Sequence, residues 1–270
     1  MFKLKERIVG SKAVGTEAVI IVDPKSEVEV DDPNEIKRVA RDYCNDLLTN
    51  RQPKPDFEED ILAKEFIHTI RMNDRSCDDS NLEELTEVRF LKTYNILIKR
   101  KGAKYNFIMK GGKSLKTALF NLCKVVWRTE KQPDRWSQST LIQLYKGKGH
   151  RGILDNQRHI HLKDEFPKFF GHLVVSASKD KLISNMTKFQ IGTKPGHRAQ
   201  EHLYVLKSVI ALYLQYNKAI ILSMWDVSKF FDREALSDCM NEVYKNEVRG
   251  KLYRLLFEMN KNTKISVQTP

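Results

Sequence analysis

The chain has 270 residues, of which 41% are hydrophobic and 30% charged, and its formal net charge is +12. This length allows one large domain or two ordinary ones, and the apolar content suffices for a core. No apolar run approaches the roughly 18 residues of a membrane span, and the N-terminus has no apolar signal core. We therefore expect no membrane partner, no secretion, and an intracellular location in the cytoplasm, the nucleus or both.

The charge is unevenly distributed. Residues 23–87 contain 19 acids against 9 bases, whereas residues 99–148 contain 13 bases against 2 acids. This division predicts a polyanion-binding face joined to an acidic module, the alternative being lysine-rich helices that are merely solvated. The 4 cysteines are far apart and form no C-x-x-C pair, which argues against a zinc site and fits a reduced compartment.

The acidic N-terminal part reads as a hairpin followed by amphipathic helices. In residues 17–30 an apolar, β-branched run (18–22) is followed by turn residues (23–26) and then by valines that alternate with acids (28 and 30). Asp32 followed by Pro33 is typical of a helix start. Apolar residues at helical spacing continue through further segments, and no functional site is evident among them. The helices expected here span residues 32–48, 57–70 and 85–100, and another, capped by Ser114 and ended by Pro133, spans residues 114–130.

A hairpin with a basic tip is predicted next. Residues 140–145 and 156–162 have strand composition, and Lys146-Gly147-Lys148-Gly149 lies in the loop that joins them. Glycines allow close backbone approach and lysines supply charge, so such a loop can close over a phosphate chain. It is not a Walker loop, because neither Ser nor Thr follows Lys148. A solvated hairpin tip is the alternative.

The last part of the chain leads to a single acid. We expect Asp226 to stand at the exposed end of a buried strand, residues 219–225, where it could hold a divalent metal close to a triphosphate; the alternative is an ordinary surface acid. The helix before this strand should turn Leu203, Leu206 and Leu214 towards a core. The other elements expected are helices at residues 165–183, 199–216, 233–244 and 248–260, a basic loop at 188–198, and a strand at 264–267.

Five short motifs follow one another along the chain: P-x-x-W at 133–136, K-G-K-G at 146–149, N-Q-R-H-I-H-L at 156–162, Q-I-G-T-K-P-G at 190–196 and D-V-S-K-F-F-D at 226–232. Their order resembles that of the fingers and first palm segments of a reverse transcriptase. The chain resembles most closely the non-LTR, LINE-type retrotransposon branch of that family, over residues 105–270 and more loosely over residues 17–100. Gln157, His159 and His161 depart from the family's N-Y-R-P-I-S-L, and Thr193 replaces its aromatic residue.

The resemblance implies an α+β fold in two parts. Residues 1–100 would be a mostly helical N-terminal extension with a leading hairpin. Residues 101–270 would be the fingers and an incomplete right-hand palm, truncated before the second catalytic motif. The activity implied is RNA-directed DNA synthesis, in which an RNA template, a DNA primer and a dNTP meet two Mg²⁺ ions.

Roles for individual residues follow from the same resemblance. Asp226 would hold both Mg²⁺ ions, and Val227 would offer a backbone carbonyl to them. Lys146 and Arg158 would neutralise the triphosphate, and Phe231 would reject a ribose 2′-hydroxyl by its bulk. The residues expected to touch the template strand are Gln190, Gly192 and Lys194.

The 270 residues contain no F/Y-A-D-D stretch, which would supply two further acids. Because Asp226 alone cannot hold two metals, we expect no polymerase activity from this polypeptide by itself. Two alternatives remain: a non-catalytic nucleic-acid-binding remnant that uses the basic face, and a protein-interaction domain built from the acidic helices. The maturase branch has similar fingers, but K-G-K-G and P-x-x-W argue against it.

Overall fold

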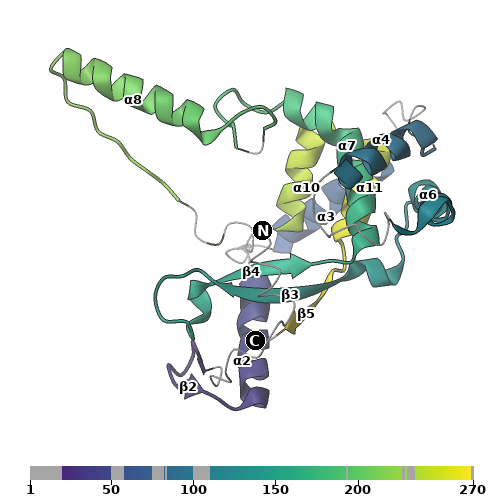
Figure 1. Ribbon diagram of the computed structural model, residues 1–270, viewed down its shortest axis with the longest axis horizontal. Coiled ribbons are helices and arrows are strands. Elements are labelled where there is room, and N and C mark those ends of the chain that lie inside the picture. Colours follow the sequence, from purple (N-terminus) through teal and green to yellow (C-terminus); the bar gives the residue numbers. More distant parts are fainter. Residues whose placement is uncertain are drawn as a thin grey trace. The chain divides into compact units, whose positions relative to one another are not determined.

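The computed structural model describes residues 20–49, 58–74, 82, 84–99, 110–192, 194–226, 229 and 235–268, which form a mixed α+β fold as expected (Figure 1). The chain divides into two compact units that are not consecutive in sequence. The expected division at residue 100 lies outside the described residues and stays a prediction. Unit 1 comprises Met1–Arg51, Gln138–Asp164 and Thr263–Pro270, and unit 2 comprises Gln52–Ser137 and Glu165–Asn262.

Unit 1 contains the predicted leading hairpin and the helix after it. Strand β1 (Ile21–Val22) pairs antiparallel with β2 (Glu29–Val30), which confirms the described part of the hairpin. Helix α2 (Pro33–Thr49) begins after Asp32, whose Oδ1 accepts hydrogen bonds from the backbone N–H groups of residues 34 and 35, at 3.0 and 2.9 Å. Asp32 is therefore the N-cap that the sequence predicts.

A three-stranded sheet forms the rest of unit 1. Strand β3 (Gln138–Tyr145) pairs antiparallel with β4 (Gln157–Leu162) on one edge and parallel with β5 (Lys264–Gln268) on the other. Figure 1 shows the three strands lying side by side. All three strands were predicted from composition, but the pairing of β5 with β3, across more than a hundred residues, was not.

Helix α2 covers one face of this sheet. The side-chain amide of Gln143 lies 3.8 Å from the sulfur of Cys44, and the rings of Tyr43 and His159 are 5.6 Å apart. Gln143 and His159 are paired across β3 and β4, so they project from the same face. Leu141 projects from that face as well and is only 1% exposed. The residues that alternate with these along β3 and β4, such as the paired Leu144 and Arg158, therefore project from the opposite face.

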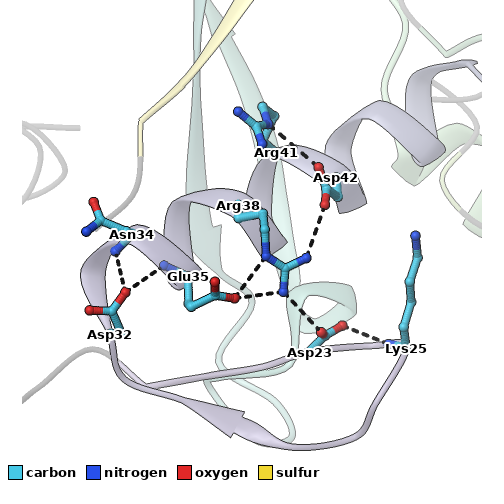
Figure 2. A network of polar contacts seen from close by, with 8 residues as sticks. All are labelled: Asp23, Lys25, Asp32, Asn34, Glu35, Arg38, Arg41 and Asp42. Atoms are coloured by element: carbon cyan, nitrogen blue, oxygen red, sulfur yellow. Dashed lines mark hydrogen bonds and ion pairs between the residues drawn. The ribbon is translucent and has the colours of Figure 1, made fainter.

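The acids of unit 1 are partly neutralised by one arginine (Figure 2). The Arg38 guanidinium lies 2.8 Å from the carboxylate of Glu35, 3.4 Å from that of Asp42 and 3.9 Å from that of Asp23. The Arg38 side chain is 47% exposed, and such exposed ion pairs stabilise a fold by less than about 1 kcal/mol each. The network therefore adds little to the stability of this acidic segment.

Unit 2 is a helical assembly around an aromatic core. Phe90, Phe169 and Phe170 are each 1% exposed, and Trp127 is fully buried. The Phe90 and Phe169 rings meet edge-on with centroids 5.4 Å apart, a favourable aromatic geometry. The helices are α3 (Glu58–Asn73), α4 (Glu87–Lys99), α6 (Gly112–Thr129), α7 (Glu165–Ser184), α8 (Ala199–Gln215), α10 (Leu236–Lys245) and α11 (Gly250–Asn260).

The start of α6 was predicted a few residues too late, whereas its end was predicted to within one residue. The helix starts at Gly112, with Gly111 rather than Ser114 at the N-cap. It ends at Thr129, ahead of Pro133, because Glu130 adopts a left-handed backbone with φ of 55°. The Glu130 carboxylate reaches back to Arg254 of α11, with Oε1 2.9 Å from Nη2. The C-terminal end of α6, which the sequence analysis attributed to Pro133, is therefore accompanied by an ion pair between Glu130 and Arg254.

Candidate phosphate-binding hairpin and the predicted acid

The loop between β3 and β4 is held in a defined conformation by its own hydrogen bonds. The backbone N–H of Lys146 donates to the carbonyl of Asn156 at 2.9 Å, which continues the strand ladder, and the Lys146 ammonium donates to the carbonyl of Asp155 at 2.7 Å. Gly149 has φ of 75°, and a Cβ there would lie 2.5 Å from the Asn156 amide nitrogen. Only glycine fits this position without displacing the amide.

The strand register places Lys146 and Arg158 on the same face of the hairpin. Leu144 pairs with Arg158, so these two side chains share a face. Lys146 lies one residue past the end of β3, where its N–H still bonds to the Asn156 carbonyl, and strand alternation extended by that residue gives it the same face. That face is opposite the one that α2 covers through Gln143 and His159. The two cations to which the resemblance gives a triphosphate role are thus both exposed on one face of the hairpin, and triphosphate binding stays a prediction.

The surroundings of these two cations are basic. Residues 146–158 also include Lys148 and Arg151, both exposed, against the single acid Asp155. The Asp155 carboxylate accepts a hydrogen bond from the Tyr43 hydroxyl of α2. Arg158 is exposed, and within the described part of the chain its guanidinium has no hydrogen bond or ion pair. An anion could therefore approach Lys146 and Arg158 without displacing an existing carboxylate partner.

The glycine loop before α8 belongs to unit 2. Gln190 and Gly192 are exposed and Lys194 is half-buried. Successive tight turns shape the loop, since the N–H groups of Gln190 and Lys194 donate to carbonyls three residues earlier at 3.3 and 3.2 Å. Thr193 lies outside the described residues. The loop has the backbone irregularity expected of it, and contact with a template remains a prediction.

At its C-terminal end the loop is tied to α8. The Nδ1 atom of His197 lies 2.8 Å from one carboxylate oxygen of Glu201, whose other oxygen accepts the backbone N–H of Arg198 at 3.1 Å. The hydrogen bond with His197, followed by that from Arg198, lowers the pKa of the Glu201 carboxyl. A carboxylate in the first turn of a helix also interacts favourably with the helix dipole, so α8 has a well-defined start.

The prediction that residues 219–225 form a buried strand was wrong. Residues 218–226 have no regular secondary structure, and Ile221, Met224 and Trp225 are 96%, 94% and 92% exposed. An apolar strand is stable only when neighbouring strands satisfy its backbone groups. No described strand pairs with this segment, and both edges of β3 are already occupied by β4 and β5.

Asp226 is therefore an exposed acid in an irregular segment. Among the described residues, no group of three or more His, Cys, Asp or Glu side chains is arranged to hold a metal ion. Asp226 thus supplies one carboxylate where a Mg²⁺ site needs several oxygen ligands. Val227 and Phe231, to which the resemblance gives metal-binding and sugar-selecting roles, lie outside the described residues.

Helix α8 also differs from its prediction. Leu203, Leu206 and Leu214, expected to face a core, are 54%, 38% and 70% exposed, and α8 contains no buried residue. Apolar side chains occur around its whole circumference, which is typical of a helix that is covered on several sides. Within the described residues nothing covers it, so α8 and the segment after it form an extended apolar surface.

The exposure of Trp225 gives a direct test of this correction. Trp127 and Trp136 are 0% and 6% exposed, so Trp225 should account for most of the acrylamide-quenchable tryptophan fluorescence. We expect Trp225→Phe to remove the red-shifted, quenchable component and to leave a blue-shifted, protected emission. If instead the quenching constant of the Trp225→Phe variant equals that of the parent protein, Trp225 is buried and the original prediction of a buried strand is restored.

Sequence comparisons leave the family of this chain open. No known protein family matches it, and no curated protein shows significant similarity to it. None of the helices in the described ranges combines the length and the apolar content that crossing a bilayer requires.

Proposed function

We propose that the chain is a reverse transcriptase segment of the non-LTR retrotransposon type. In this proposal residues 101–270 are the fingers and the first part of the palm, and they bind an RNA template, a DNA primer and a dNTP. The observation that carries the proposal is the shared face of Lys146 and Arg158 on the β3–β4 hairpin, beside a loop that requires glycine. Two cations so placed can neutralise adjacent phosphates of one triphosphate.

The geometry of the hairpin supports this role beyond the motif itself. Lys146 is anchored by its backbone and by its ammonium to the far limb of the loop, so its charge is held over the turn. Arg158 is exposed, and its planar fork suits bidentate contact with phosphate oxygens. Lys146, which is fixed, and Arg158, which is accessible, can together bind an anion more tightly than a solvated hairpin tip would.

The described residues supply only part of the metal site that the proposal includes. The resemblance assigns Mg²⁺ to Asp226 and to the carbonyl of Val227, but the described residues offer only one carboxylate there. We therefore derive no catalytic step from this chain. The groups that it does supply would bind and orient the nucleotide rather than activate it.

Triphosphate binding tests the proposal. We expect a fluorescent dNTP analogue, titrated in the presence of Mg²⁺, to bind the parent protein, and Arg158→Gln to weaken that binding about tenfold or more, since one charge-assisted contact contributes about 1.5–3 kcal/mol. Lys146→Gln should weaken it similarly. Lys179→Gln, which removes an exposed charge from α7, is the matched control. Equal affinities for the parent and Arg158→Gln proteins would rule out the hairpin as a phosphate site.

Primer extension tests the expectation that this polypeptide is inactive alone. With Mg²⁺, a homopolymer template and a labelled primer, we expect the 270-residue protein to add no nucleotides above background. Robust incorporation that Asp226→Ala abolishes would overturn that expectation. It would show that Asp226 has metal-binding partners in addition to those of the described residues.

A further inference from the structure

Helix α6 carries a row of cations without a single acid. From residue 110 to residue 129 the sequence contains Lys and Arg but neither Asp nor Glu. Residues three and four positions apart lie on one face of a helix, so a single face carries most of this charge. The side chains at 113, 117, 121 and 128 are exposed, and that at 124 is half-buried. The residues of this face, hereafter the α6 basic face, are Lys113, Thr117, Asn121, Lys124 and Arg128.

The other side of α6 is firmly embedded in the core of unit 2. Leu119 and Val126 are each 2% exposed, and Cys123 and Trp127 are fully buried. Burial raises the pKa of the Cys123 thiol to about 12, in keeping with its apolar surroundings. The α6 basic face therefore stands on a rigid scaffold. At 1.5 Å per residue, its cations extend over about 22 Å.

Two described acids near this face, Glu84 and Glu130, do not block it. Glu84 lies 3.7 Å from the Lys124 ammonium, but the two side chains are 66% and 42% exposed, so the pair is weak and open to competition. Glu130, just past the end of α6, is engaged by Arg254 through two hydrogen bonds. The field over the face is consequently positive.

A depression beside the face adds a place for a bound group. Its cavity volume is about 260 Å³. Lys124 and Arg128 supply two cations to its wall, Asn121 supplies an amide, and Glu84 supplies an acid. A phosphate or sugar seated there would meet hydrogen-bond donors from α6. The residues lining it are Glu84, Leu85, Asn121, Lys124, Val125 and Arg128.

We infer that the α6 basic face binds the phosphodiester backbone of a nucleic acid. Lys, Arg, Thr and Asn are side chains that contact phosphate and sugar, and they do so without reading sequence. A duplex carries one charge per about 1.7 Å of its axis, so a face of about 22 Å runs beside roughly 13 phosphates. An acidic protein partner fits less well, because protein interfaces are enriched in aromatic residues and depleted in lysine, whereas this face has no aromatic residue.

This inference rests on the proposed function only in the choice of partner, a template or primer strand. It assigns that strand to a surface that the resemblance does not identify, on the helix ahead of the hairpin. The hairpin and the α6 basic face make separate predictions. The hairpin should control affinity for a dNTP, and the α6 basic face should control affinity for a polynucleotide.

Fluorescence anisotropy with a labelled 20-nucleotide RNA, and with DNA of the same sequence as single strand and duplex, tests the inference over a range of salt concentrations. The test variant is Lys113→Gln/Lys124→Gln/Arg128→Gln. The control variant, Lys179→Gln/Lys181→Gln/Lys245→Gln, removes the same charge from exposed positions of α7 and α10. We expect the test variant to bind about tenfold or more weakly near physiological salt, and to lower the salt slope by about 2–3. The control should change neither.

Further measurements exclude trivial outcomes. Lys113→Arg/Lys124→Arg should retain parent affinity, and circular dichroism should show that every variant is folded. Unlabelled poly-glutamate of matched charge should compete poorly. Three results would each overturn the inference: an unchanged salt slope in the test variant, an equal loss in the control, or competition by poly-glutamate equal to that by unlabelled RNA. The hairpin variant Arg158→Gln, assayed with the same RNA, separates the two sites. It should weaken dNTP binding and leave RNA affinity close to that of the parent protein.

Discussion

Replacing Glu130 by alanine is expected to lower the free energy of unfolding of unit 2 by about 3 kcal/mol. The Glu130 carboxylate forms two hydrogen bonds with the Arg254 guanidinium, and Arg254 is 9% exposed. Without the carboxylate, the buried guanidinium loses both hydrogen bonds and the ion pair with Glu130, so much of its desolvation is no longer offset. Urea denaturation followed by circular dichroism measures the change.

Two further variants separate the charge from the helix end. Glu130→Gln keeps a hydrogen-bonding side chain and should cost less than Glu130→Ala. Glu130→Ala/Arg254→Met removes both charges and should recover most of the lost stability, because no buried ion remains. Two results together would contradict this role: a free energy of unfolding for Glu130→Ala within about 1 kcal/mol of the parent value, and a double variant that is less stable than Glu130→Ala. They would show that Glu130 does not stabilise a buried Arg254 charge.

Trp127→Ala should destabilise unit 2 by about 3–5 kcal/mol. The indole is fully buried, its N–H donates to the carbonyl of Leu82 at 2.8 Å, and its ring centroid lies 6.4 Å from that of Phe170. Truncation leaves a cavity in the core and an acceptor that has lost its donor. A thermal or urea unfolding curve of the variant, compared with that of the parent, gives the difference.

Trp127→Phe is the matched comparison for this site. It retains an aromatic ring, so most of the packing survives, but it removes the hydrogen bond to Leu82 and should cost about 1–3 kcal/mol. A truncation at an exposed position of the same helix, Val125→Ala, should change stability little, since Val125 is 49% exposed. Equal effects of Trp127→Ala and Val125→Ala would contradict the described packing.

The hairpin at residues 138–162 shows how far local pattern can lead. Strand β3 is mostly apolar from Leu141 to Tyr145, and Ile160 and Leu162 alternate with histidines in β4. Lys146 to Gly149 has turn composition, so both strands and the loop were predictable. The shared face of Lys146 and Arg158 then follows from the register, which the loop length and alternation constrain. The covering of the other face by α2 was not predictable, because the contact of Cys44 with Gln143 spans 99 residues and that of Tyr43 with His159 spans still more.

The apolar stretch before Asp226 shows the opposite case. Its composition favours a buried strand, yet composition expresses only a preference that neighbouring strands must satisfy. Within the described residues these neighbours are absent, and Trp225 remains 92% exposed. The same holds for α8. Its helical periodicity was predicted correctly, but Leu203 and Leu214, which were predicted to be buried, are exposed.

The sequence alone determined what depends on a few adjacent residues: the cap at Asp32, the helical and strand periods, the glycine loop and the segregation of charge. Backbone sterics and side-chain spacing act over one or two turns, so their effects can be predicted from residues that are close together in the sequence. Only the tertiary structure decided which partners met, including the parallel pairing of β5 with β3, the ion pair of Glu130 with Arg254, and the side of α6 that stays open. These depend on contacts between distant segments, whose burial and pairing free energies no local pattern records.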